Sequence, residues 1–125
     1  MGLKYQIDSD GDFKLLFGLE DNRSQWIYIN SNTERFHGLE IREVWSFAID
    51  ISGLPDPGLM LYLLKNNREL KFGSWRMSEK SGGGYFVIFA AQTSAESDAD
   101  MLYAVMEMVM SVADGLEKMY GQDDN

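Results

Sequence analysis

Residues 44–51 alternate between large apolar side chains and smaller ones, and this pattern constrains the fold more than any other stretch of the chain. Because successive side chains of a β-strand point to opposite faces, a period of two is typical of a half-buried antiparallel strand. One face is predicted to carry Trp45, Phe47, Ile49 and Ile51, and the other Val44, Ser46, Ala48 and Asp50. The chain is therefore expected to contain an antiparallel sheet.

Four further runs, rich in apolar, aromatic or β-branched residues, predict the rest of that sheet. They lie at residues 13–17, 25–30, 70–77 and 85–91. The last two runs flank residues 78–84, where three consecutive glycines indicate the loop of a hairpin. The sheet is thus expected to have about five to six strands.

A short helix is predicted in the middle of the chain. Asp56 is a suitable N-cap, and Pro57 fits the first helical position, where its missing N–H costs nothing. The pair Asn66-Asn67 is expected to end this helix. Its spacing of apolar residues predicts a buried stripe formed by Leu59, Met60, Tyr62, Leu63 and Leu64.

A long helix is predicted at about residues 97–120, with Ser97 as its cap and Gly121 as its end. Its broad apolar face comprises Leu102, Val105, Met106, Val109, Val112, Ala113, Leu116 and Met119 or Tyr120. Strands followed by helices that cover one face of an antiparallel sheet make an α+β sandwich. The predicted organisation is one domain over residues 1–120 and a polar, acidic tail over residues 121–125.

The composition excludes several kinds of chemistry. A chain of 125 residues without cysteine has no disulfide, thiolate nucleophile or cysteine-ligated metal, and a single histidine excludes multi-histidine sites. We therefore expect no cofactor and no metal. The N-terminus does not resemble a signal peptide, and no apolar run approaches the roughly 18 residues that span a membrane. A cytoplasmic protein without a membrane partner is expected.

The net charge of -9 argues against a nucleic-acid partner, because an acidic surface repels phosphate. The charge is uneven, since residues 65–92 carry five basic and two acidic side chains, a local net of +3. A nucleic-acid interface would have to use the five basic residues of this segment, which are Lys65, Arg68, Lys71, Arg76 and Lys80. We expect instead a mildly basic hairpin on an acidic surface.

Three segments resemble known sites without meeting their requirements. Residues 8–12 begin like a calcium-binding loop, but their glycine is misplaced and the twelfth position is Leu19, so an Asp/Gly turn is expected. The glycines at 82–84 enter a strand, whereas a phosphate-binding loop enters a helix. His37 lacks a neighbouring nucleophile and orienting group, so it is interpreted as a loop residue.

Five of the eight methionines lie in the long helix, and they widen its apolar face beyond what one sheet requires. Methionine adapts to irregular gaps and to surfaces that accept varied partners. An ordinary amphipathic core helix explains much of the pattern, while a helix that also meets a partner explains the excess. The residues predicted to form a dimer or partner surface are Met101, Val105, Met108, Val112, Trp26 and Tyr28.

The chain resembles the YbjN family, within the type III secretion chaperone-like superfamily. Two segments carry the resemblance: residues 5–13, where a strand ends and restarts through an acidic glycine turn, and residues 63–73, where a Leu-rich helix ends at asparagine and leads into a Phe-Gly strand. The closing hairpin and the long last helix match as well. Those proteins usually begin with an amphipathic helix that helps to form client grooves, whereas this chain enters a strand almost at once.

The resemblance implies a small, acidic, non-enzymatic sandwich that is usually dimeric and binds an extended client on apolar patches. The first functional hypothesis is thus a chaperone-like or regulatory homodimer that recognises a polypeptide through apolar surface. The second is a small-molecule-binding or catalytic domain, with carboxylates in a cleft between sheet and helices. The aromatic residues that could line such a pocket are Trp26, Tyr28, Trp45 and Trp75.

Overall fold

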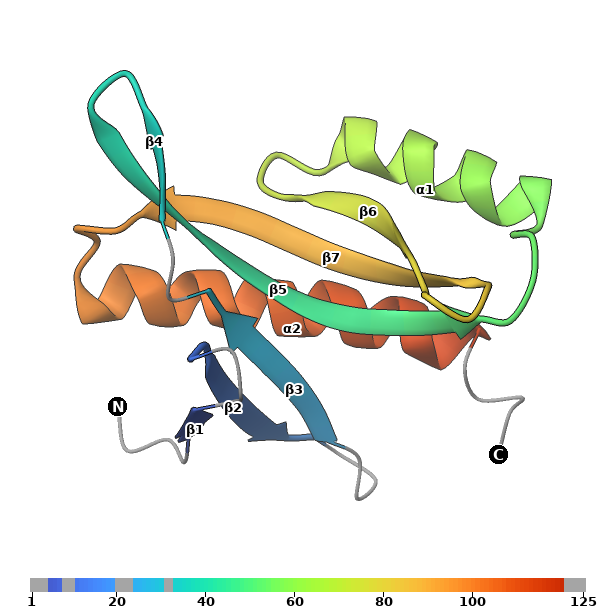
Figure 1. Ribbon diagram of the computed structural model, residues 1–125, viewed down its shortest axis with the longest axis horizontal. Helices are drawn as coiled ribbons and strands as arrows, with labels where there is room; N and C mark the ends of the chain where they lie inside the picture. The colour runs from blue at the N-terminus through green and yellow to red at the C-terminus, as the bar shows by residue number, and fades with distance from the viewer. Residues whose placement is uncertain (1–4, 8–10, 20–23, 31–32, 121–125) are drawn as a thin grey trace.

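The computed structural model describes residues 5–7, 11–19, 24–30 and 33–120 (Figure 1). Over these residues the chain forms seven strands and two helices, in the order β1 (Tyr5–Ile7), β2 (Phe13–Gly18), β3 (Ser24–Ile29), β4 (Glu34–Phe36), β5 (Leu39–Ile51), α1 (Pro57–Glu69), β6 (Ser74–Glu79), β7 (Tyr85–Ser94) and α2 (Ala99–Tyr120). The α+β prediction is confirmed. The predicted tail, Gly121 as helix end and part of the Asp/Gly turn (residues 8–10) lie outside the described residues.

All strands belong to one antiparallel sheet of order β1-β2-β3-β5-β7-β6, with the short β4 paired to the start of β5. The long strands β5 and β7 form its centre, where they pair from Ile41↔Ser94 to Ile51↔Tyr85. By contrast, β3 pairs with β5 at only two positions, Tyr28↔Trp45 and Ile29↔Val44. The β2–β3 hairpin therefore turns away from the central strands (Figure 1).

Both helices lie on the same side of the sheet. Helix α2 runs along β5 and β7, behind the sheet in the view of Figure 1, and α1 lies beside the edge strand β6. The two helices meet where the ring of Tyr62 lies 6.4 Å from the ring of Tyr120 and its hydroxyl contacts the sulfur of Met119. Neither helix covers the opposite face of the sheet, so the side chains on that face are not packed against a helix.

The structure shows which face of β5 the helices cover, a point that the alternation alone left open. Val44, Ser46 and Ala48 are buried beneath α2, whereas the larger Trp45 and Phe47 point to the uncovered face. The small side chains fit because α2 supplies the bulk at this layer, including the fully buried Met106 and Val109. The face of this strand that carries the larger side chains, Trp45 and Phe47, is therefore not the face that meets the helices.

A β-bulge divides β5 into two parts. Phe47 pairs with Ile88, and the next paired position is Ile49 with Val87, so Ala48 is the extra residue. A bulge shifts the side-chain alternation by one position. As a result Ile49 and Ile51 pack against the covered core, and the prediction that they share a face with Trp45 and Phe47 is wrong.

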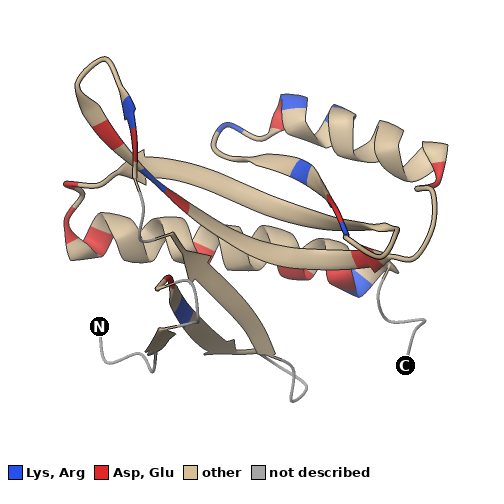
Figure 2. Ribbon diagram, viewed as in Figure 1, with Lys and Arg blue, Asp and Glu red and all other residues tan. Residues whose placement is uncertain are grey.

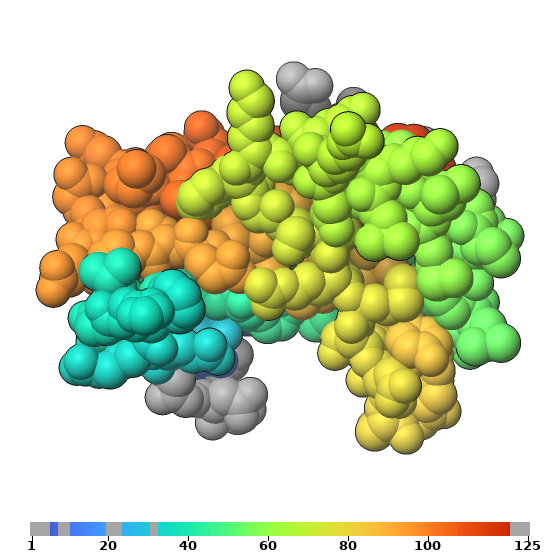
Figure 3. All heavy atoms as spheres, turned by 90° about the horizontal axis from the view of Figure 1, so that it is seen from above, coloured from blue at the N-terminus to red at the C-terminus, as the bar shows by residue number. Residues whose placement is uncertain are grey.

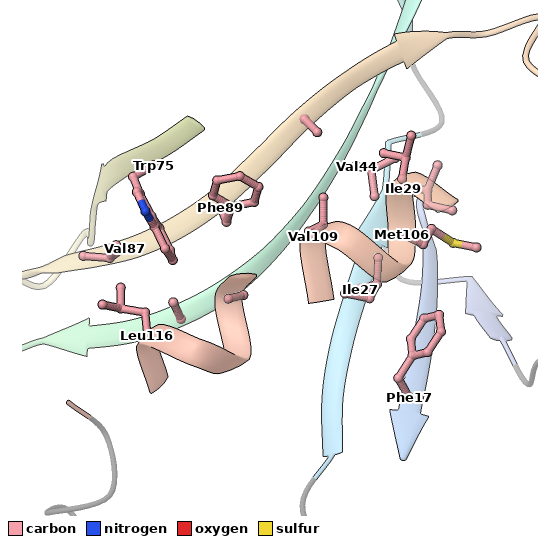
Figure 4. Close-up of a cluster of buried hydrophobic side chains, with 14 of the residues drawn as sticks. Phe17, Ile27, Ile29, Val44, Trp75, Val87, Phe89, Met106, Val109 and Leu116 are labelled. Atoms are coloured by element: carbon pink, nitrogen blue, oxygen red, sulfur yellow. The ribbon is translucent and has the colours of Figure 1, made fainter. Parts of the chain in front are cut away.

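The core lies between α2 and the sheet (Figure 4). Helix α2 contributes Val105, Met106, Val109, Ala113 and Leu116, as its apolar periodicity predicts. Facing them are side chains from five strands, and the largest fully buried hydrophobic ones among these are Ile27, Val44, Val87 and Phe89. Met119 and Tyr120, which were also assigned to the apolar face, remain exposed, because the helix extends past the end of the core there.

Two buried polar side chains join β3 to β5 where the strands separate. The Ser46 hydroxyl donates a hydrogen bond to the carbonyl of Trp26 at 2.6 Å. The side-chain amide of Gln25 donates to the Ser46 hydroxyl at 2.7 Å and to the Phe47 carbonyl at 2.6 Å. Because these carbonyls lack a partner strand at the separation and the bulge, the side chains supply the hydrogen bonds that the sheet does not.

Helix α1 begins as predicted, with the Asp56 carboxylate accepting a hydrogen bond from the N–H of Leu59 at 3.2 Å. It continues past Asn66-Asn67 to Glu69, so the predicted end is wrong. The side chains of the two asparagines instead form hydrogen bonds with Trp75 of β6. The predicted buried stripe narrows to Leu59 and Leu63, since the other three members, Met60, Tyr62 and Leu64, are exposed.

The start of α2 also differs from expectation. Helix α2 is capped by Asp98, whose carboxylate accepts from the N–H of Met101 at 2.9 Å, while Ser97 bonds to the Thr93 hydroxyl. The segment before Gly38, which lay outside the predicted strands, contains β4, and His37 lies in the turn to β5 with a positive φ of 52°. His37 is therefore the loop residue that was expected.

Within the described part of the chain, no helix is long and apolar enough to cross a membrane.

Candidate functional site

A row of aromatic side chains crosses the uncovered face of the sheet. The row consists of Trp26 and Tyr28 from β3, Trp45 and Phe47 from β5, and Phe86 from β7; we call it the aromatic row. Tyr28 stacks on Trp45 with ring centroids 4.4 Å apart. Phe47 meets Trp45 edge-on at 5.0 Å and Phe86 at 4.8 Å. Each ring is only partly exposed, because its neighbours on adjacent strands cover part of it.

The register of the strands produces this row. Tyr28 lies directly opposite Trp45 across the β3–β5 pairing, and Phe47 lies opposite Ile88 across the β5–β7 pairing. Phe47 shares the uncovered face with Trp45 by ordinary alternation, and the bulge at Ala48 turns the apolar side chains that follow, Ile49 and Ile51, inward. Small residues, such as the buried Ala90 opposite Trp45, leave room for the large rings to lie over the sheet.

Positive side chains stand at both ends of the aromatic row. The Lys14 ammonium lies 4.2 Å from the ring centroid of Trp26, and the Lys80 ammonium lies 5.2 Å from that of Phe86. Lys80 also forms an ion pair with Asp50. Each cation is therefore already held by a ring or a carboxylate, which lowers its availability for a further anion.

A third cation lies beside the row on β6. The Arg76 guanidinium donates to the Glu43 carboxylate at 2.6 Å, and the side-chain amide of Gln92 donates to the same oxygen at 3.0 Å. Between these charged groups, the middle of β5 and the whole of β7 carry no charged residue (Figure 2). The centre of the face is thus apolar, and each of the three cations at its margin contacts a ring or a carboxylate.

A groove of about 820 Å³ lies over part of this face. Its floor is formed by Trp45, Phe47, Phe86 and Ile88, and one wall is formed by the hairpin residues 78–83. In the space-filling view the β6–β7 hairpin and the β4–β5 hairpin project from the same side of the molecule, with a recess between them (Figure 3).

Comparison of the chain with protein-family models, curated proteins and solved structures gives no match.

The six residues predicted as a partner surface separate into two groups. Trp26 and Tyr28 belong to the aromatic row, while the four residues of α2 lie on the other side of the sheet. Of these four, Val105 is buried in the core at 4% exposure, and Val112 is partly buried against it. The sequence alone gives no register between β3 and α2, so it could not separate the two groups.

Met101 and Met108 line a hollow of about 520 Å³ between α2 and the end of β7, and Phe72 closes one side of it. Met101 and Phe72 are about half exposed, at 54% and 46%. The other side chains that line the hollow are uncharged. This hollow is an apolar surface separate from the aromatic row.

The structure does not bring together all of the residues considered for a small-molecule or catalytic pocket, or all of those considered for a nucleic-acid interface. Trp75 is buried, with its ring 5.0 Å from that of Phe89, so it does not join Trp26, Tyr28 and Trp45. Over the described ranges, the hollows between sheet and α2 are not lined by carboxylates, and no cluster of three or more His, Asp or Glu side chains is placed to hold a metal. Among the five basic residues considered for nucleic acid, Arg76 and Lys80 border the aromatic face, and both are paired.

Phe47 and Phe86 are the members of the site that sequence reasoning did not single out. The signal in the sequence is the alternation of Phe86, Ile88 and Ala90 in β7, which places an aromatic residue on the same face as Trp45 once the two strands are paired. That pairing joins segments about forty residues apart along the chain, and its register is not written in either segment.

Proposed function

We propose that this chain is a non-enzymatic protein-binding module that receives an extended, apolar segment of a partner polypeptide on the aromatic row. The observation that carries the proposal is the row itself: four rings from three strands lie in contact on a sheet face that neither helix covers, and Lys14 joins the fifth ring, Trp26, to Tyr28. Aromatic side chains are the usual anchors of protein interfaces because they bury a large area with few rotatable bonds. A cytoplasmic location and the likeness to secretion chaperones belong to the same proposal.

The charges around the row favour a polypeptide over a nucleic acid. A phosphate backbone needs free cations, but Arg76 is bonded to Glu43 and Lys80 is paired with Asp50. Tyr28 and Trp45 stack on each other, so these two rings have one face fewer to offer to a base. An apolar peptide segment requires neither free cations nor free ring faces, and it would bury the edges of the rings.

Alanine substitutions in the row test this proposal. Peptides selected from a random displayed library on the wild-type protein are expected to be rich in apolar and aromatic residues. Tyr28→Ala and Phe86→Ala are each expected to weaken binding of a selected peptide by more than about tenfold, as is typical of aromatic anchors. Fluorescence anisotropy with labelled peptide measures the affinity, and thermal unfolding establishes that each variant is folded.

Phe72→Ala is the matched control, because Phe72 is exposed on the helix side of the molecule. It is expected to leave peptide binding unchanged. A loss of binding in Phe72→Ala with none in Phe86→Ala would move the binding site to the hollow beside α2. Selection of single-stranded nucleic acid in preference to any peptide would contradict the proposed class of partner.

Homodimer formation is the second part of the proposal, and the hollow beside α2 supports it. Met101 and Phe72 leave apolar area exposed around this hollow, and its uncharged lining would let two chains of charge -9 meet without direct contact between carboxylates. Static light scattering is expected to give twice the monomer mass for the wild type. Met101→Glu is expected to give the monomer mass, because it places a charge in the contact.

Met119→Glu controls for the added charge, since Met119 is equally exposed at the other end of α2. It is expected to remain dimeric. A wild-type protein that is monomeric at high micromolar concentration would contradict the dimer while leaving the peptide-binding proposal standing.

A further inference from the structure

A smaller and more enclosed hollow lies under the first turn of α2, on the covered side of the sheet. Its volume is about 260 Å³. Its walls are mainly apolar and include Phe13, Leu15, Leu102 and Met106. This hollow is separate from the aromatic row, because Leu15 and Met106 belong to the buried core that faces α2.

One charged side chain, that of Arg42, lines this hollow. Arg42 lies on β5 opposite Thr93 and is partly buried. Over the described ranges, Arg42 takes part in no ion pair and no side-chain hydrogen bond. A guanidinium keeps its charge at all ordinary pH values, and it is costly to place beside apolar walls without an anion. The hollow therefore offers a cation whose counter-charge the described chain does not supply.

Hydroxyl groups next to Arg42 add hydrogen-bond donors. The hydroxyls of Thr93 and Ser97, both of which line the hollow, lie 2.9 Å apart. Since one of them donates to the other, the accepting hydroxyl retains a proton for another acceptor. The start of α2, which carries the positive end of the helix dipole, lies at the same place, and Asp98 is not part of the lining.

We propose that this hollow binds a small carboxylic acid with an apolar body. The carboxylate would accept two hydrogen bonds from the planar guanidinium of Arg42, which matches a carboxylate in shape, and one from the hydroxyl pair. The apolar body would lie between Leu15, Leu102 and Met106. Because a cavity of about 150 Å³ holds benzene, a volume of about 260 Å³ has room for about ten non-hydrogen atoms. An eight-carbon fatty acid is of this size.

Isothermal titration calorimetry with sodium octanoate, below its micellar concentration, tests the proposal on the full chain. Octanoate is expected to bind at one site per chain, and 1-octanol, which lacks the charge, at least tenfold more weakly. Arg42→Gln is expected to reduce octanoate affinity at least tenfold, to the level of octanol. Arg68→Gln, an exposed arginine on α1, is expected to change nothing. Leu102→Trp, which fills the hollow, is expected to abolish binding of both compounds.

Equal affinity for octanoate and octanol, or octanoate binding that survives Arg42→Gln, would overturn the assignment. A peptide ending in leucine with a free carboxylate distinguishes a free acid from a chain terminus, and tighter binding of that peptide than of octanoate would overturn the small-molecule assignment. Nuclear magnetic resonance shifts confined to Arg42, Ser97 and Leu102 on octanoate addition would support it independently of affinity. Loss of peptide binding to the aromatic row would leave all of these results unchanged.

Discussion

Phe89→Ala is expected to lower the free energy of unfolding by about 3–5 kcal/mol, as is usual when a buried phenylalanine is truncated. Phe89 is fully buried at the centre of β7, its ring lies 5.0 Å from that of Trp75, and it faces α2 (Figure 4). The ring also lies directly against Gly73, so its loss removes contacts to β6 and to the loop before it as well as to α2. Urea denaturation followed by circular dichroism measures the change.

Phe36→Ala is the matched control for this substitution. Phe36 is 62% exposed at the end of β4, so the same truncation there is expected to cost less than about 0.5 kcal/mol. Because small domains are stable by only about 5–15 kcal/mol, Phe89→Ala should leave a marginal protein and Phe36→Ala a normal one. Similar unfolding midpoints for the two variants would show that the core is not centred on Phe89.

Gly84→Ala is expected to destabilise the protein by about 2–4 kcal/mol, for two reasons that add. Gly84 ends the β6–β7 loop with a φ of 90°, which is unfavourable for any residue with a Cβ. An added Cβ would also overlap the carbonyl oxygen of Ile51 and lie 3.2 Å from the carbonyl carbon of Ser52. Since both neighbours are backbone atoms of β5 and the residue after it, the hairpin would have to move away from the end of that strand.

The two preceding glycines separate these causes. Gly83 has a φ of 98° but open space around it, so Gly83→Ala is expected to cost only the backbone strain, about 1 kcal/mol. Gly82 has neither constraint, and Gly82→Ala is expected to be neutral. The order Gly84, Gly83, Gly82 should appear in thermal unfolding midpoints, and a Gly82 variant as unstable as the Gly84 variant would contradict this account.

Both helices and most of the strands were predictable because each is encoded within a short window, whereas the short β4 lay in no predicted run. Alternation in β5, the glycine-rich hairpin and the Asp56–Pro57 start of α1 all appear where they were expected. The covered face of β5 was not predictable, because the bulge at Ala48 arises from pairing with β7 and has no local signature. The same holds for Asn66 and Asn67, which read as a helix end and instead bond to Trp75, nine and eight residues away.

The candidate site was predictable in part. Trp26 and Tyr28 were assigned to a partner surface from their residue type, and they lie in the aromatic row. Their neighbours Phe47 and Phe86 become part of the same surface only when three strands are placed in register. Arg42 had no distinguishing feature in the sequence, since its lack of a partner is a property of the folded chain.

The bonds of Asn67 have a consequence for the edge of the sheet. Its side-chain amide accepts from the Trp75 N–H at 2.6 Å and donates to the Trp75 carbonyl at 3.3 Å, while Asn66 holds the indole N–H at 2.7 Å. The backbone N–H and carbonyl of Trp75, on the edge strand β6, are the two groups through which this residue would bond to another strand. Exposed edges of this kind are where β-proteins polymerise and form aggregates. One asparagine side chain thus occupies, near the start of the edge strand β6, the backbone groups that a strand added to this edge would need.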